Sequence, residues 1–258
     1  MNKNAQVIDG IDNNNTTFCT GFWYIQDNIK RNLNHYLDFG NKTFNLLQKN
    51  NLVFFYEDEK ILDWSKKNIH NNAYKLNQIN LVNLPTYELS KYYLESCKNQ
   101  STESLKKIDQ GNEKGIAHYE RDYLIAGENT YRKLFTIWTS KIFLVEKVIQ
   151  ENFFNTEFFA WTDISISRFN YKRENWNFIE HKYSENYIYH YDGNMKYYGK
   201  KININGSFIF GHKEKWLELV RIFKNQLTNS KNSRYAHDEE TLLNLIYQKN
   251  TSLFYKLN

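Results

Sequence analysis

The stretch TEFFAWTDISISR, residues 156–168, decides the fold that this chain is expected to adopt. Residues 158–161 are apolar without alternation, which is typical of a strand covered on both faces in a parallel sheet. Asp163 follows at the carboxyl end of this strand, and open sheets of this kind bind ligands just beyond the carboxyl ends of their strands. The carboxylate of Asp163 therefore either caps the next turn or faces a ligand.

Strand and helix patterns alternate along the rest of the chain and predict an α/β protein. Expected strands are residues 16–25, 51–59, 79–85 and 202–210, and expected helices are residues 27–50, 131–149 and 216–227, with a last helix that starts near residue 237. The clearest helix is 131–149, where apolar residues recur at three- and four-residue steps and form one face. We expect a single domain over residues 16–258, with a disordered or frayed N-terminus at 1–15 and an exposed polar insertion near 98–115.

Composition and charge limit the classes of function. The chain has 258 residues, of which 41% are hydrophobic and 24% charged, as in ordinary globular proteins. Its net charge of +5 suits an anionic ligand but falls short of the concentrated basic stripe of a dedicated nucleic-acid binder. Cys19 and Cys97 lack the spacing of a disulfide scaffold or a zinc site. The N-terminus lacks the apolar segment of a signal peptide, and no run reaches the ~20 apolar residues of a membrane span, so we expect a cytoplasmic protein.

Five blocks of the sequence are informative together: TFCTGFWYI (17–25), IWTSKIFLV (137–145), ENFFNTEFFAWTDISISR (151–168), NGSFIFG (205–211) and HDEETLLNLIY (237–247). In this order they resemble the HtrL/YibB family of bacterial proteins. The central block is the specific one and the others are short, and residues 60–130 and 170–200 are unmatched. The resemblance implies a GT-A-type glycosyltransferase, which is an αβα sandwich around a mixed, mostly parallel sheet.

That resemblance also implies the partners. The donor would be a nucleoside diphosphate sugar, and the acceptor a lipooligosaccharide or capsular glycan, including a lipid-linked one. We expect no nucleic-acid partner, and at most peripheral contact with the inner face of the membrane. Inversion or retention at the sugar stays open.

Proteins of this type usually carry an Asp-x-Asp motif at the end of a central strand. Here the matching residues are Asp163, Ile164 and Ser165, so the second carboxylate is absent. Magnesium sites often use only one or two protein carboxylates, with waters and phosphate oxygens as the other ligands. We therefore expect a divalent cation, Mn²⁺ or Mg²⁺, at Asp163, helped by the hydroxyl of Ser165. The alternative is that lysine and arginine side chains stabilise the leaving diphosphate in place of the metal.

The resemblance also assigns contacts with the nucleotide sugar. The residues are Thr20, Gly21, Phe22, Arg31, Lys141, Arg168, Asn205, Gly206 and Ser207. Lys141 and Arg168 would reach a phosphate, as a point charge and as a planar fork. Structural alternatives exist for several of them: the stem of Lys141 can pack on the apolar stripe of its helix, and Gly206 can form a β-bulge.

The sequence HDEE, residues 237–240, opens the last predicted helix. Acids in a first helical turn gain roughly 0.3–1 kcal/mol from the helix dipole, which explains them without any function. An inverting transferase, however, needs a carboxylate that takes the proton of the acceptor hydroxyl. The resemblance favours Asp238 as this base, with Glu239 as the second choice.

Two other functions stay open on the sequence. One is a non-catalytic glycan- or polyanion-binding protein that retains a GT-A-like fold, which the missing second acid favours. The other is nucleic-acid binding by residues 170–201, where aromatic and basic residues alternate as they do on base-stacking surfaces.

Overall fold

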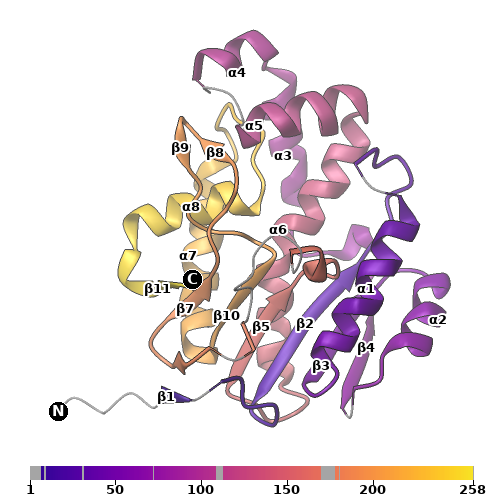
Figure 1. Cartoon of the computed structure of the whole chain (residues 1–258). Coiled ribbons are helices and arrows are strands. Elements are labelled where there is room, and N and C mark those ends of the chain that lie inside the picture. The colour runs from indigo at the N-terminus through magenta and orange to yellow at the C-terminus, as the bar shows by residue number, and fades with distance from the viewer. Residues whose placement is uncertain are drawn as a thin grey trace.

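The structure, a computed structural model, is built around a seven-stranded sheet (Figure 1). It describes residues 7–8, 10–30, 32–71, 73–108, 113–169, 178–179 and 181–257. The strands of the sheet are β2 (Thr16–Phe22), β3 (Asn51–Tyr56), β4 (Tyr74–Gln78), β5 (Phe158–Thr162), β7 (Ile188–His190), β10 (Phe208–His212) and β11 (Phe254–Lys256). Their order across the sheet is β11-β7-β10-β5-β2-β3-β4.

Strand direction makes this sheet mixed and mostly parallel. Strands β5, β2, β3 and β4 are parallel neighbours, and β11 is parallel to β7. Within the part of the chain that the structure describes, β10 alone runs against the other six strands, antiparallel to both β5 and β7. This arrangement confirms the predicted α/β class and is compatible with a GT-A-like sandwich.

Helices cover both faces of the sheet. They are α1 (Leu33–Leu47), α2 (Glu59–Asn68), α3 (Tyr87–Lys98), α4 (Thr102–Ile108), α5 (Lys114–Ala117), the π-helix η2 (His118–Ile125), α6 (Glu128–Glu151), α7 (Lys213–Ser230) and α8 (Glu239–Lys249), with short 3₁₀ turns η1 (Leu81–Asn83), η3 (Ile166–Phe169) and η4 (Thr251–Leu253). Helices α1 and α2 pack on one face, and α3, α6, α7 and α8 on the other. No helix in the described ranges has the length and apolar character needed to cross a membrane.

Strand β5 lies between the two cores, as its unbroken apolar sequence predicts. Phe159 and Trp161 join the core under α6, whereas Phe158 and Ala160 join the core under α1. All four side chains are buried. Successive residues of a strand point to opposite faces, so a strand with helices on both sides must be apolar at every position.

The order of the strands creates a crevice between β2 and β5. The chain runs from β2 to β3 and β4 on one side of the sheet, and then returns to place β5 on the other side of β2. Ligands bind at such a switch point, beyond the carboxyl ends of the strands. Because β10 is antiparallel, its first residue, Phe208, pairs with Thr162 at the end of β5. The loop before β10 therefore reaches the same edge.

Small two-stranded pairs complete the fold. Strand β1 (Val7–Ile8) pairs with β6 (Tyr183–Ser184), and β8 (Lys196–Tyr197) pairs with β9 (Lys200–Lys201). The described part of the predicted frayed N-terminus thus contains a short paired strand.

One sequence prediction needs correction. The predicted strand at 79–85 is wrong: the strand is β4, which precedes it, and residues 81–83 form η1. Leu81 and Leu84 are buried although they lie at a turn, and their apolar pattern resembles that of a strand. The polar stretch near 98–115 includes the short helix α4, and most of its described side chains are exposed, although Leu105 is buried.

Replacement of Phe159 tests the central position of β5. The change Phe159→Ala leaves a cavity beneath α6 and is expected to lower the free energy of unfolding by about 3–5 kcal/mol, measured by urea denaturation. The matched control is Phe153→Ala, because Phe153 is 41% exposed in the turn before β5 and should change stability far less. Equal effects of the two substitutions would contradict a buried β5.

Candidate functional site

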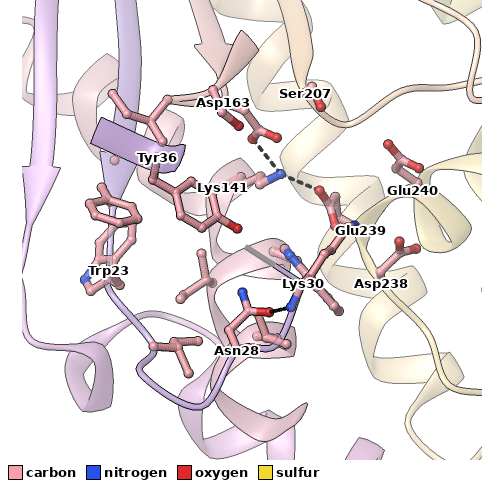
Figure 2. A pocket seen from close by; sticks show the side chains of 18 of the residues that line it. Trp23, Asn28, Lys30, Tyr36, Lys141, Asp163, Ser207, Asp238, Glu239 and Glu240 are labelled. Atoms are coloured by element: carbon pink, nitrogen blue, oxygen red, sulfur yellow. Dashed lines mark hydrogen bonds and ion pairs between the residues drawn. The ribbon is translucent and has the colours of Figure 1, made fainter. Parts of the chain in front are cut away.

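A pocket lies at the edge where β2 and β5 end (Figure 2). One wall comes from the end of β2 and the loop that follows it, and the opposite wall from the first turn of α8. Residues after β5 and before β10 form the floor, and side chains of α6 and η2 close the remaining side. Its acidic, basic and histidine lining residues are Lys30, Lys114, His118, Asp122, Lys141, Asp163, Arg168, Asp238, Glu239 and Glu240.

Lys141 lies at the centre of the site, between two carboxylates, as Figure 2 shows. Its ammonium is 2.8 Å from Oδ1 of Asp163 and in close contact with Oε1 of Glu239. The carbonyl oxygen of Gly206 lies 3.5 Å from the same nitrogen. Only 6% of the Lys141 side chain is exposed. The contacts join α6, the end of β5 and the start of α8.

Opposite charges fix the ionisation of Lys141 and Asp163. Burial lowers the pKa of Lys141, but Asp163 and Glu239 outweigh it, and the pKa is raised above its usual value. Burial likewise raises the pKa of Asp163, but Lys141 and Arg168 outweigh it and hold this pKa well below the usual range. Trp161 also donates to Oδ1 of Asp163, over 3.1 Å. Asp163 is therefore an ionised, hydrogen-bonded carboxylate that faces a pocket.

Glu239 has different properties from its neighbours. Lys141 holds Oε1, while Oε2 has no hydrogen-bond partner among the residues that the structure describes. Burial, together with the nearby carboxylates of Asp238, Glu240 and Asp163, raises the pKa of Glu239 to about 7 against the opposing effect of Lys141. One oxygen is thus fixed and the other is available, with a proton affinity suited to exchange near neutral pH.

Asp238 is fully engaged by protein groups. Its Oδ1 accepts a hydrogen bond from the backbone N–H of Thr241, and the hydroxyl of Thr241 accepts one in return from the N–H of Asp238, so the pair forms a capping box at the start of α8. Its Oδ2 lies 3.0 Å from Nζ of Lys114 and 2.9 Å from Nε2 of His118. Burial raises the pKa of Asp238, but Lys114 and His118 outweigh it, and the pKa lies well below its usual range. Of the two candidate bases, Glu239 therefore has the more suitable geometry.

A second charged network borders the pocket on the side of η2. Nδ1 of His118 lies 2.7 Å from Oδ2 of Asp122, and Arg121 also binds this carboxylate. Lys114 bridges from Asp238 to Glu240, 2.6 Å away. The π-helical winding of η2 carries His118 and Asp122, and π-helical segments occur frequently at functional sites.

The loop before β10 approaches α8 closely. The N–H of Gly206 donates to Oε1 of Glu240 over 2.9 Å. A Cβ atom at Gly206 would lie 2.7 Å from Oε1 of Glu239, so only glycine permits this approach. The N–H of Ser207 donates to Oδ1 of Asn205 over 2.8 Å, which shapes the loop.

Arg168 follows β5 and closes the floor of the pocket. Its guanidinium donates to the carbonyl oxygen and hydroxyl of Ser165 and, over 3.2 Å, to the hydroxyl of Ser207. One guanidinium nitrogen lies 3.9 Å from Oδ2 of Asp163. The loop after β5 and the loop before β10 therefore hold the guanidinium group of Arg168 at the surface of the pocket.

Aromatic side chains line the wall formed by β2. The ring of Phe22 lies 5.1 Å from that of Tyr36. The indole N–H of Trp23 donates to the carbonyl of Ile79 over 2.9 Å, which fixes the orientation of its ring. A Cβ atom at Gly21 would lie 2.6 Å from the Trp23 ring, so the indole can pack here because residue 21 has no side chain. The wall offers flat apolar surface opposite the charged groups.

Most of the predicted site residues converge on this pocket. Those that line it are Gly21, Phe22, Lys141, Asp163, Arg168, Ser207, Asp238 and Glu239, while Asn205 and Gly206 support it. Thr20 points into the interior of the protein and does not line the pocket. Arg31 lies outside the described residues. Lys114, His118 and Asp122 also line the pocket but were not predicted from the sequence. Their spacing of four residues, which places side chains on one face of a helix, was the available signal.

The expected divalent cation fits this arrangement poorly. No group of three or more His, Cys, Asp or Glu side chains is placed to hold a metal among the described ranges. The ammonium of Lys141 already occupies the space between Asp163 and Glu239, and the hydroxyl of Ser165 is bound by Arg168. Asp163, Glu239 and Ser165 are therefore each already bound by a basic side chain of the protein.

The chain belongs to the HtrL/YibB family. Residues 14–257 match the family described as bacterial protein of unknown function (HtrL_YibB). This confirms the resemblance seen in the sequence blocks and extends it over nearly the whole chain. A comparison with curated proteins gives no match.

The raised pKa of Glu239 predicts a pH dependence of stability. A carboxyl group with a higher pKa in the folded than in the unfolded protein stabilises the fold below its ordinary value of 4.5, and this contribution is lost as the pH rises to about 7. The free energy of unfolding of the wild type, minus that of Glu239→Gln, is expected to fall by about 3 kcal/mol over that window.

Urea denaturation at a series of pH values measures this difference. The control is Glu151→Gln, which removes one carboxylate from the more exposed ion pair with Lys147 on α6. A difference that rises with pH for Glu239→Gln would show that its pKa is lowered instead.

Proposed function

We propose that this protein is a glycosyltransferase that uses a nucleoside diphosphate sugar as donor. The observation that carries the proposal is Glu239, a buried carboxylate with one oxygen fixed by Lys141 and the other available in a pocket at the switch point of the sheet. A titratable group with a perturbed pKa in such a cleft is a candidate for catalysis. The fold and the blocks shared with the family support the same class of enzyme.

The two walls of the pocket suit the two ends of such a donor. The aromatic wall with Trp23 and Tyr36 offers flat surface for a base and ribose, next to the backbone of Gly21. Arg168 offers a guanidinium fork to the diphosphate, a pairing in which arginine geometry is favourable. The sugar would then lie between Arg168 and the first turn of α8.

Glu239 would act as the base of an inverting displacement. As the acceptor hydroxyl oxygen attacks the anomeric carbon, its proton passes to Oε2 of Glu239 and the nucleoside diphosphate leaves with the electron pair of the broken bond. Lys141 keeps Oε1 in place, and burial together with the neighbouring acids gives Glu239 the proton affinity that the step requires. Asp238 and Glu240 hold the start of α8 in place, and this first turn carries Glu239.

The acceptor that we propose is a lipooligosaccharide or capsular glycan. The support is the family resemblance, since the chemistry of the pocket itself selects only a hydroxyl nucleophile. A glycan of this kind would be met at the inner face of the membrane.

A non-catalytic glycan-binding protein is the second candidate. The observation that favours it is that Lys141 already pairs with Asp163 and Glu239 within the protein itself. This candidate predicts glycan binding without release of a nucleotide.

Ligand-induced stabilisation tests the donor. We expect one of UDP, GDP, dTDP or CDP, or one of their sugars, to raise the melting temperature by about 5–10 °C at roughly 100 times its dissociation constant. Arg168→Ala should reduce the shift, and Arg221→Ala on α7, away from the pocket, serves as the matched control. If no nucleotide stabilises the wild type, a nucleotide-sugar enzyme is ruled out in favour of the second candidate.

Kinetics of two variants test the base. Glu239→Gln keeps the shape of the side chain but removes its basicity, and should lower kcat by about 10²–10⁴ while nucleotide binding persists. Asp238→Asn keeps an acceptor for the N–H of Thr241 and should mainly lower stability, because Lys114 loses a buried partner. A larger loss of kcat in Asp238→Asn than in Glu239→Gln would reassign the base to Asp238.

A further inference from the structure

The three hydrogen-bonding directions of the Lys141 ammonium all meet protein oxygens. A lysine ammonium has three N–H donors and no acceptor. Here the three partners are Oδ1 of Asp163, Oε1 of Glu239 and the carbonyl of Gly206. These are oxygen ligands from three different segments, directed at one positive centre in a buried place.

An oxygen-lined centre with two carboxylates is the environment in which proteins hold hard divalent cations. The ammonium of Lys141 occupies that centre in this chain. A metal ion bound to Oδ1 of Asp163 would have to share the oxygen with a positive charge 2.8 Å away. Like charges at such a distance repel strongly where water is scarce, so the ammonium and a divalent ion exclude each other.

We propose that Lys141 is a built-in cation that takes the place of a divalent metal ion, and that Asp163 and Glu239 become a metal-binding pair when Lys141 is removed. The wild-type site then needs no metal to hold its charge balance. The nucleotide part of this inference rests on the proposed function, but the metal part concerns only these side chains.

The surrounding structure keeps the ammonium in this position. Lys141 extends from the middle of α6, where Ile142, Leu144 and Val145 anchor the helix in the core. Gly206 lacks the Cβ atom that would displace the carboxylate of Glu239. If Lys141 is shortened, the carboxylates of Asp163 and Glu239 face the same small space. Arg168 lies near only Oδ2 of Asp163, which is not the oxygen that Lys141 binds.

The first experiment uses the wild-type protein. Mn²⁺ alone should leave its melting temperature unchanged, and titration followed by electron paramagnetic resonance should show no bound ion that depends on Asp163. UDP and GDP, tested in the presence of a chelator and then of Mn²⁺, should bind with dissociation constants that agree within about threefold.

The second experiment uses Lys141→Ala. Mn²⁺ alone should raise its melting temperature by about 5–10 °C at roughly 100 times the dissociation constant, and the resonance titration should show about one bound ion. The gain should disappear in Lys141→Ala combined with Asp163→Asn. The matched control is Lys147→Ala, because Lys147 lies on the same helix in an exposed pair with Glu151 and its loss should create no metal site.

Two results would overturn the proposal. One is Mn²⁺ binding by the wild type that is lost in Asp163→Asn, because the metal and Lys141 would then coexist. The other is a folded Lys141→Ala protein that gains no affinity for Mn²⁺. If Lys141→Ala fails to fold, the wild-type titration decides alone: a bound ion lost in Asp163→Asn refutes the proposal, and the lack of one supports it.

The outcomes also separate this inference from the proposed function. Failure of every nucleotide to bind the wild type would count against the transferase, while the Mn²⁺ measurements would still decide the role of Lys141. Metal-dependent nucleotide binding would support the transferase and refute the built-in cation.

Discussion

The buried ammonium of Lys141 is the constraint on which the rest of the site depends. A charge that is removed from water must be paired and hydrogen-bonded, and loss of one partner leaves the others unpaired at a cost of about 3–5 kcal/mol. Lys141, Asp163 and Glu239 are far apart in the sequence and belong to α6, the end of β5 and the start of α8. Their contact therefore fixes how these three elements meet.

The topology of the sheet explains why these elements can meet at a pocket. The parallel strands β2 and β5 end at the same edge, and the antiparallel β10 begins there, so three loops converge without any long excursion of the chain. Helix α8 directs its N-terminus to the same edge, where the helix dipole favours acidic side chains. The sheet thus supplies rigid walls, and the charged groups supply the chemistry between them.

The sequence predicts the elements that carry Asp163, Lys141 and Glu239, but it does not predict the contribution of Lys114 and His118 to the pocket. The unbroken apolar run of β5, the amphipathic pattern of α6 and the acids before α8 are local signals, and each predicts its element. Lys114 and His118 lie in a polar stretch with weak periodicity, and the π-helical winding that turns His118 toward Asp238 has no sequence signature. The division of roles between Asp238 and Glu239 was also out of reach, because it depends on which oxygens the folded protein occupies.

Helix geometry accounts for that division. Asp238 is the N-cap of α8 and has an extended backbone, whereas Glu239 and Glu240 are helical, where successive residues point about 100° apart. Asp238 and Glu240 meet Lys114, whereas Glu239 between them points to Lys141. Burial of Glu239 is the largest cause of its raised pKa of about 7, and the two flanking carboxylates add to it. The helix cap and the proton affinity of the candidate base thus arise from the same short run of acids, and a change of Asp238 will alter both.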